Sequence, residues 1–137
     1  MRIKLHLIRY FYSMMTGYIA DNKAFYQPMF FEFPHEPMAY SSSLENNVML
    51  STQLKLSMQS SHINKNVTEF WFPPGIWCDI FNDKGIDGCM NLTEGISMNM
   101  STKAYEFYLH IREGSVVPMQ DGTELAKNYK VSNTADL

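Results

Sequence analysis

Charged residues are scarce in this chain, and they do not cluster. Asp, Glu, Lys and Arg make up 18% of the 137 residues, the formal net charge at pH 7 is -3, and the 11 lysines and arginines are spread along the sequence. Proteins that bind nucleic acid usually carry a basic stripe or patch that neutralises phosphates. We therefore predict that nucleic acid is not a partner.

Long apolar runs are missing as well. No stretch approaches the roughly 18 to 20 consecutive apolar residues that a membrane-spanning helix requires, so we predict no membrane span. Residues 1–10 begin like the basic part of a signal peptide, but His6 and Arg9 interrupt the apolar part and no small-x-small cleavage site follows. We predict no signal peptide in this sequence.

Cysteine occurs only at positions 78 and 89. Two cysteines cannot establish a disulfide framework, so two alternatives stay open: Cys78 and Cys89 pair in an oxidising compartment, or both are buried free thiols. His62 is the only histidine nearby in the sequence, and the spacing matches no zinc-binding signature. We predict no metal ion and no other cofactor.

Apolar and aromatic side chains, in contrast, are abundant, at 45% and 14% of the residues. This composition is typical of a folded chain, and the length fits one modest core. In the richest stretch, Glu69–Phe81, the sequence Pro73-Pro74-Gly75 separates two runs of strand-favouring residues, which predicts a β-hairpin with a tight turn. A second aromatic stretch, Gln27–Pro34, lies between prolines that cannot donate to a ladder, and we predict a strand there.

Hydrophobic periodicity predicts a helix near the N-terminus. Between Ile3 and Ile19 the apolar residues recur mainly at steps of three and four, as in an amphipathic helix with a wide apolar face. We expect the helix to end at Asp21–Lys23. A helix this apolar needs a partner surface.

Alternation of apolar and polar residues predicts further strands. Residues 50–58 alternate strictly, which predicts one half-buried strand with a polar outer face. Residues 96–101 and 106–112 alternate in the same way, and Ser115–Met119 is expected to form a short last strand. The chain as a whole is therefore predicted to be mainly β, an antiparallel β-sandwich preceded by one amphipathic α-helix.

Three sequences match the acceptor pattern for N-glycosylation, at Asn66-Val-Thr68, Asn91-Leu-Thr93 and Asn99-Met-Ser101. Chance is one explanation for them, and passage through the secretory route is the other. On the second explanation the protein would be located in the ER, in a lysosome or outside the cell, and Asn66, Asn91 and Asn99 would be its glycosylation sites.

Four ordered motifs resemble the C-terminal part of family 31 glycoside hydrolases, the α-glucosidase-like retaining enzymes. They are Tyr10-Phe-Tyr12 in the predicted helix, Gln27-Pro-Met-Phe-Phe-Glu-Phe-Pro34, Phe72-Pro-Pro-Gly-Ile-Trp-Cys-Asp79 and His110-Ile-Arg-Glu-Gly-Ser-Val-Val-Pro-Met-Gln120. The resemblance implies that residues 1–24 form the last helix of a catalytic (β/α)8 barrel. It implies that residues 25–137 form the β-sandwich that follows, incomplete at its C-terminus.

The chain also departs from the family pattern. Arg9 stands where the family usually has proline, Gln27 where it has arginine, Ser51 where it often has glycine, and Cys78 where it commonly has tyrosine. These departures are typical of a divergent member, and they put the activity in doubt more than the fold.

Retaining glycoside hydrolysis needs two carboxyl groups about 5 to 5.5 Å apart. The catalytic aspartates of the family lie in barrel motifs that this sequence does not contain, so no catalytic residue is predicted here. Asp79, Asp83 and Asp87 are expected to be solvated, and Glu32 to be paired or at an edge. The resemblance thus predicts a non-catalytic support domain for a barrel in the same or another chain, which alone meets the carbohydrate substrate.

A second function from another class stays open. A stand-alone β-sandwich could bind glycan, because sugar rings stack on exposed aromatic faces such as those of Trp71, Trp77, Tyr26 and Tyr105. It could instead assemble with copies of itself into a homo-oligomer through an outer strand surface, for example Met98–Met100.

Overall fold

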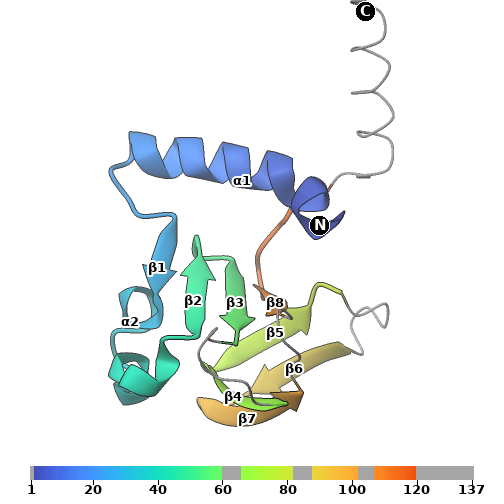
Figure 1. Cartoon of the computed structure of the whole chain (residues 1–137). Helices are drawn as coiled ribbons and strands as arrows, with labels where there is room; N and C mark the ends of the chain where they lie inside the picture. The colour runs from blue at the N-terminus through green and yellow to red at the C-terminus, as the bar shows by residue number, and fades with distance from the viewer. Residues whose placement is uncertain (1, 60–65, 82–87, 102–106, 120–137) are drawn as a thin grey trace, which may run out of the picture. The chain divides into compact units, whose positions relative to one another are not determined.

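A computed structural model of the chain describes residues 2–59, 66–81, 88–101 and 107–119 (Figure 1). The chain separates into two compact units, and the following paragraphs describe each by itself. Of the described residues, 2–23 and 116–119 belong to one unit, and those within Ala24–Ser115 belong to the other.

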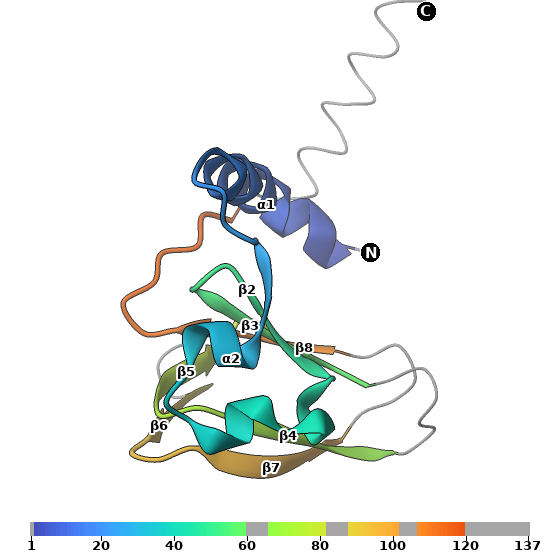
Figure 2. The ribbon, with the colours of Figure 1, turned by 90° about the vertical axis from the view of Figure 1, so that its left-hand side faces the viewer.

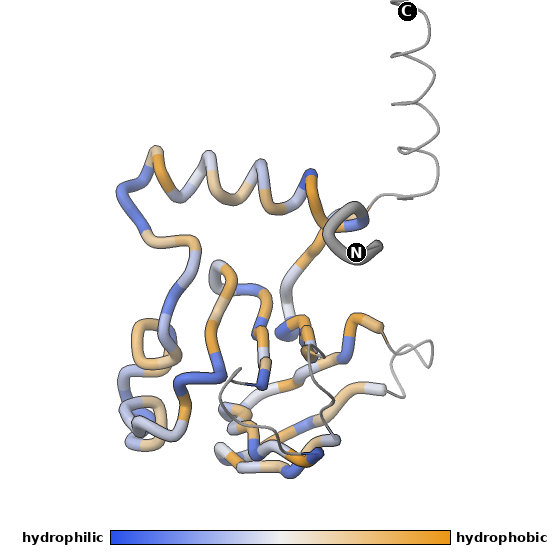
Figure 3. Tube along the Cα trace, in the orientation of Figure 1, coloured by the Kyte–Doolittle hydropathy of each residue, from blue (hydrophilic) through white to orange (hydrophobic). Residues whose placement is uncertain are grey.

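The first unit contains the helix α1, Arg2–Ala20. Its end has a defined cause: Asn22 adopts the left-handed conformation, with φ 55. Lys23 N donates to Tyr18 O at 2.8 Å and Asn22 N to Ile19 O at 3.1 Å, the pair of bonds that defines a Schellman cap. The predicted helix and its end at Asp21–Lys23 are thus present. Coloured by hydropathy, α1 mixes apolar and polar segments along its length (Figure 3).

The second unit is an antiparallel β-sandwich. Six strands form one sheet in the order β1-β2-β3-β8-β5-β6, and two strands, β4 and β7, form the other. The strands of the large sheet are β1 Tyr26–Pro28, β2 Asn47–Leu50, β3 Leu54–Met58, β8 Phe107–Arg112, β5 Gly75–Asp79 and β6 Cys89–Leu92. Those of the small sheet are β4 Val67–Phe72 and β7 Ile96–Ser101. In Figure 2 the small sheet forms a layer of its own beside the larger one. The predicted fold class is confirmed.

The core between the layers is largely aromatic. Phe33 lies with its ring 6.3 Å from that of Trp71, edge to face, and 6.2 Å from that of Trp77. Nine buried residues form this cluster: Met29, Phe33, Ala39, Leu44, Met49, Phe70, Trp71, Phe72 and Trp77. They come from both sheets and from the segment after β1, so the cluster joins all parts of the unit.

The predicted hairpin at Glu69–Phe81 is wrong. β4 and β5 do not pair with each other: β4 pairs with β7, whereas β5 pairs with β6 and β8. The prolines between them carry the chain from one sheet to the other, and Gly75 makes the bend with φ 121. The physical reason is burial, because Phe70, Trp71, Phe72 and Trp77 are all buried, and a two-stranded hairpin could not cover both faces of β4.

The predicted single strand at residues 50–58 is also wrong. The chain reverses at residues 51–53, and β2 and β3 form a hairpin closed by the pair Leu50↔Leu54. Ser51 makes this turn with φ 60, and its hydroxyl accepts from Gln53 N at 3.2 Å. Lys55 is buried, although alternation assigned it to the wet face. The face of β3 that carries Lys55 is covered by β4, since Lys55 Nζ lies 3.9 Å from the ring centroid of Phe72.

Two further predictions fail for local reasons. The strand predicted at Gln27–Pro34 ends at Pro28 and continues as the helical turn α2, Met29–Glu32, which Phe33 N closes by donating to Met29 O at 3.0 Å. Short 3-10 helices follow at η1, Pro37–Tyr40, and η2, Ser42–Leu44. The strand predicted at Ser115–Met119 does not form, because this segment pairs with no described strand and Pro118 has no N–H to donate.

Candidate functional site

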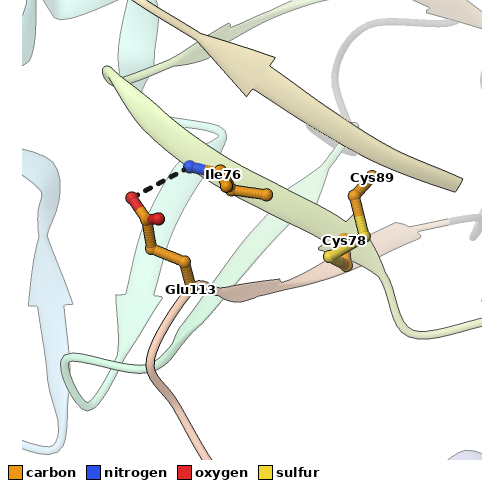
Figure 4. The surroundings of a disulfide bond; sticks show 4 residues. All are labelled: Ile76, Cys78, Cys89 and Glu113. Atoms are coloured by element: carbon orange, nitrogen blue, oxygen red, sulfur yellow. Dashed lines mark hydrogen bonds between the residues drawn. A yellow bond between two sulfur atoms is a disulfide. The ribbon is translucent and has the colours of Figure 1, made fainter. Parts of the chain in front are cut away.

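The carboxylates that the structure describes near the sandwich core bind groups of the chain itself. Glu32 Oε1 accepts from Arg112 Nη1 at 2.6 Å, and Asp79 Oδ1 accepts from Phe81 N at 2.9 Å. Glu113 Oε1 accepts from Ile76 N at 3.2 Å (Figure 4). These three carboxylates therefore have structural roles, and the contacts described do not bring two of them together around a shared substrate. Asp83 and Asp87 lie outside the described residues, so the absence of a catalytic pair stays a prediction.

The ion pair between Glu32 and Arg112 connects α2 to the end of β8. The Arg112 guanidinium also lies 5.0 Å above the ring of Phe33, a cation–π contact. Both charged side chains are partly exposed, so water screens the attraction between them. The pair therefore fixes how α2 meets the sheet more than it adds stability.

Cys78 and Cys89 are joined by a disulfide, with the sulfur atoms 2.04 Å apart (Figure 4). The two residues are directly opposite each other on β5 and β6. The bond therefore ties the edge strand β6 to the strand that carries Trp77.

The three asparagines of the glycosylation patterns are exposed. Asn66 comes just before β4, Asn91 lies in β6 and Asn99 lies in β7. Accessibility is what a glycan requires of its attachment site, and occupancy of these sites stays a prediction.

The aromatic residues considered for sugar binding separate into two groups. Trp71 and Trp77 are buried in the core, and Trp77 Nε1 donates to Pro73 O at 2.9 Å, so neither indole can stack on a sugar. Tyr105 lies outside the described residues. Tyr26 is exposed, as expected of a stacking residue.

Sequence analysis missed two other exposed aromatics. Phe30 and Tyr40 stack with ring centroids 5.5 Å apart and an interplanar angle of 16°. Together with Tyr26 they border a groove of about 420 Å³. The spacing of Met29 and Phe33, four apart and both buried, would have indicated a helical turn with Phe30 outside it.

A buried polar cluster lies on the side of the large sheet that faces β4. Lys55 Nζ donates to Asn47 Oδ1 at 2.8 Å and to Ser57 Oγ. The same Nζ lies 3.9 Å from the ring centroid of Phe72. Burial lowers the pKa of the Lys55 ammonium well below its usual value of 10.5.

His110 belongs to the same cluster. It is the partner of Lys55 in the register of β3 and β8, and its ring lies 4.8 Å from that of Phe72. Burial, and to a smaller extent the charge of Lys55, lower the pKa of His110 to about 3. His110 Nδ1 has no hydrogen-bond partner among the described residues. The cluster is basic, and neither ion pair among the described residues involves it, which is unusual for a protein interior.

Other kinds of site find no support in the part of the chain that the structure describes. There, no three His, Cys, Asp or Glu side chains come together in a way that could hold a metal ion. Within the same residues no helix is both long and apolar enough to cross a membrane.

The sandwich with a tryptophan-lined core defines a β domain in which three of the described carboxylates, those of Glu32, Asp79 and Glu113, bind groups of the domain itself. The family model of the glycosyl hydrolase family 31 C-terminal domain matches residues 22–117. The chain therefore belongs to this family, as the motifs predicted.

Solved structures of similar fold are parts of much longer enzymes. A GH31 dextranase of Flavobacterium johnsoniae matches with a TM-score of 0.70 at 15% identity, covering 86% of this chain and 14% of the dextranase. The cycloalternan-forming enzyme of Listeria monocytogenes matches with a TM-score of 0.67 at 20% identity, covering 87% of this chain and 11% of that enzyme. A GH31 α-xylosidase from a soil metagenome matches with a TM-score of 0.59 at 20% identity, covering 77% of this chain and 14% of the xylosidase. This chain thus spans about a seventh of the length of the dextranase, and at these identities the matches show the fold.

Proposed function

We propose that the chain is the non-catalytic C-terminal support domain of a glycoside hydrolase that cleaves α-linked glycosyl bonds. The catalytic (β/α)8 barrel would lie in the remainder of the same polypeptide or in another chain, and carbohydrate would bind there. Two observations support this proposal: the chain matches only a terminal portion of long family 31 enzymes, and Glu32, Asp79 and Glu113 are engaged within the domain.

The observation that carries the proposal is an exposed apolar stripe on α1. Ile8 and Met15 are each 48% exposed, and Tyr12 and Ile19 are each 74% exposed. Their spacing of four, three and four places them on one face of the helix. Beside the stripe a groove of about 350 Å³ is lined by Ile8, Arg9, Tyr12 and Ser13. Contiguous exposed apolar surface on a helix marks a protein interface, and a barrel is the partner we propose.

The size of the native polypeptide tests this proposal. An antibody against the chain should detect in the source cells either a polypeptide several times heavier than 15.9 kDa or a stable complex with a separate barrel. A free product of 15.9 kDa without a partner would contradict it.

A variant pair tests the interface in that native enzyme. Tyr12→Asp puts a charge in the stripe and should reduce assembly and glycosidase activity at least tenfold, the effect of about 1.4 kcal/mol of interface energy. Ala20→Asp is the matched control, because Ala20 is exposed, lies on another face of α1 and does not line the groove. Equal activity of both variants would exclude the stripe as the interface.

The second candidate function is glycan binding, and the groove between Tyr26, Phe30 and Tyr40 favours it. Paired exposed rings beside the hydroxyls of Ser41 and Ser42 offer a stacking face and a polar rim, the combination that suits a pyranose. Titration of the chain with glucose oligosaccharides, followed by NMR, should shift signals of these residues. Loss of those shifts in Tyr40→Ala, with no change in Tyr12→Ala, would support this function.

We also infer a secretory location. The disulfide between Cys78 and Cys89 supports an oxidising compartment, and the exposure of Asn66, Asn91 and Asn99 supports glycosylation there. Enzymatic removal of N-glycans should lower the apparent mass of the native protein. Each Asn→Gln variant at one of these three sites should lower it by the mass of one glycan. An unchanged mass would contradict glycosylation.

A further inference from the structure

The interior of the sandwich holds two basic side chains in one place. Lys55 and His110 are opposite each other on β3 and β8, and therefore on the same face of the large sheet. That face looks toward β4, because Lys55 Nζ lies 3.9 Å from the centroid of Phe72 and 5.9 Å from that of Phe70. Lys55 is 0% exposed and His110 is 2% exposed. Both groups are thus removed from water.

Among the residues that the structure describes, the hydrogen-bond partners of Lys55 are uncharged. Asn47 on β2 and Ser57 on its own strand accept its hydrogen bonds, and β4 contributes aromatic rings. The described ion pairs are Lys23 with Asp21 and Arg112 with Glu32, neither of which involves this cluster.

Among the described residues, the carboxylate in register with the cluster is Asp79. It is opposite His110 on β5, and its Oδ1 accepts from Phe81 N. His110 itself adds a second base rather than a counter-charge. A buried ammonium or imidazolium without an anion is costly, and such groups give up their proton instead.

We propose that Lys55 and His110 form an acid-sensitive device in the core, both uncharged in the folded domain, so that protonation of either loosens the packing between the two sheets. The neutral amine and imidazole pack against Phe72. Each charged form needs water or an anion, which it obtains only when the layers separate.

The direction of the effect follows from which state binds more protons. Both pKa values are lower in the folded domain than in the unfolded chain. The unfolded chain therefore takes up protons first as the pH falls, and folding weakens. The contribution of Lys55 to the free energy of unfolding is complete only above its usual pKa of 10.5. It declines as the pH falls from there to the lowered pKa of the folded domain. The contribution of His110 to the free energy of unfolding is complete above its usual pKa of 6.5 and is lost as the pH falls toward its lowered pKa.

This device would favour a near-neutral compartment. Of the secretory locations proposed above, the ER and a neutral extracellular fluid fit a domain that is stable at neutral pH, and an acidic lysosome does not. Lys55 and His110 are buried whichever enzyme the domain belongs to, so this device can be tested independently of the proposed function.

Urea unfolding of the full chain between pH 5 and pH 9 tests the proposal. The unfolding equilibrium constant of the wild type should increase as the pH falls, by up to tenfold per pH unit for each proton taken up. Lys55→Met should flatten this dependence above pH 6.5, and His110→Gln should flatten it below. Lys23→Met is the matched control, because Lys23 is exposed, and its profile should run parallel to the wild type.

A second measurement does not depend on the variants folding. The Lys55 side-chain nitrogen has distinct NMR shifts as an amine and as an ammonium, and in the folded wild-type chain the change between them should occur well below pH 10.5. A change at or above pH 10.5 would overturn the proposal. A Lys55→Met profile parallel to the wild type would overturn it as well.

Discussion

The interior of the sandwich contains two regions that differ in the kind of side chain they bury. Around Phe33, Trp71 and Trp77 the side chains are aromatic, and their packing stabilises the fold as apolar surface leaves water. Around Lys55 and His110 the side chains are polar, and the fold must compensate for the water they lose. The first region accounts for stability, whereas the second makes stability depend on pH.

Removing an indole from the aromatic region should have the largest effect. Trp77→Ala leaves a cavity beside Phe33 and deletes the hydrogen bond to Pro73 O, so we expect a loss of about 3 to 5 kcal/mol in the free energy of unfolding. Urea denaturation of the full chain measures it. Tyr26→Ala, at an exposed ring, should change stability by less than about 0.5 kcal/mol. Equal effects of the two variants would show that Trp77 does not hold the core.

The disulfide should rank second. Replacing Cys78 and Cys89 together by serine frees the edge strand β6 from β5, and we expect a loss of roughly 2 to 4 kcal/mol. Wild-type protein treated with a reductant should lose a similar amount, which controls for the change of side chain. If the reductant leaves the urea midpoint unchanged, the bond does not contribute to stability.

Local patterns in the sequence predicted those helices and strands whose formation depends least on contacts with distant parts of the chain. The helix α1 and the strands β7 and β8 follow from periodicity, because it depends only on which residues share a face. The turn at Ser51 was missed because a serine with φ 60 stands where the left-handed conformation favours glycine. The Pro73-Pro74-Gly75 signal predicts a change of direction but does not determine which sheet the next strand joins.

The polar cluster could not be predicted from local patterns at all. A lysine that alternates with leucines is normally solvated, and alternation does not say which of the two faces is dry. The burial of Lys55 depends on β8, more than fifty residues away, and on the rings of β4. The groove beside Phe30 and Tyr40 was missed for a related reason, since a helical turn replaced the expected strand.

Adding one carbon to the aromatic region should have an intermediate effect. A Cβ at Gly95 would lie 2.9 Å from Trp71 Nε1, within the indole that fills this region. Gly95→Ala should therefore cost roughly 1 to 3 kcal/mol through overpacking. Gly17→Ala is the matched control: no atom lies within 4 Å of the added carbon, and the variant should stabilise α1 by up to about 1 kcal/mol. If both variants changed the free energy of unfolding in the same direction, the result would contradict tight packing around Trp71.

The ion pair at the rim of the aromatic region should have the smallest effect. Glu32 and Arg112 are both partly exposed, so a double-mutant cycle with Glu32→Gln and Arg112→Met should give a coupling of about 0.5 to 1 kcal/mol. Salt screens exposed charges, so the coupling should shrink at 1 M NaCl. Arg112→Met alone should cost more than Glu32→Gln alone, because Arg112 also lies over Phe33. A coupling above 2 kcal/mol would mean that this rim is as well shielded from water as the cluster around Lys55.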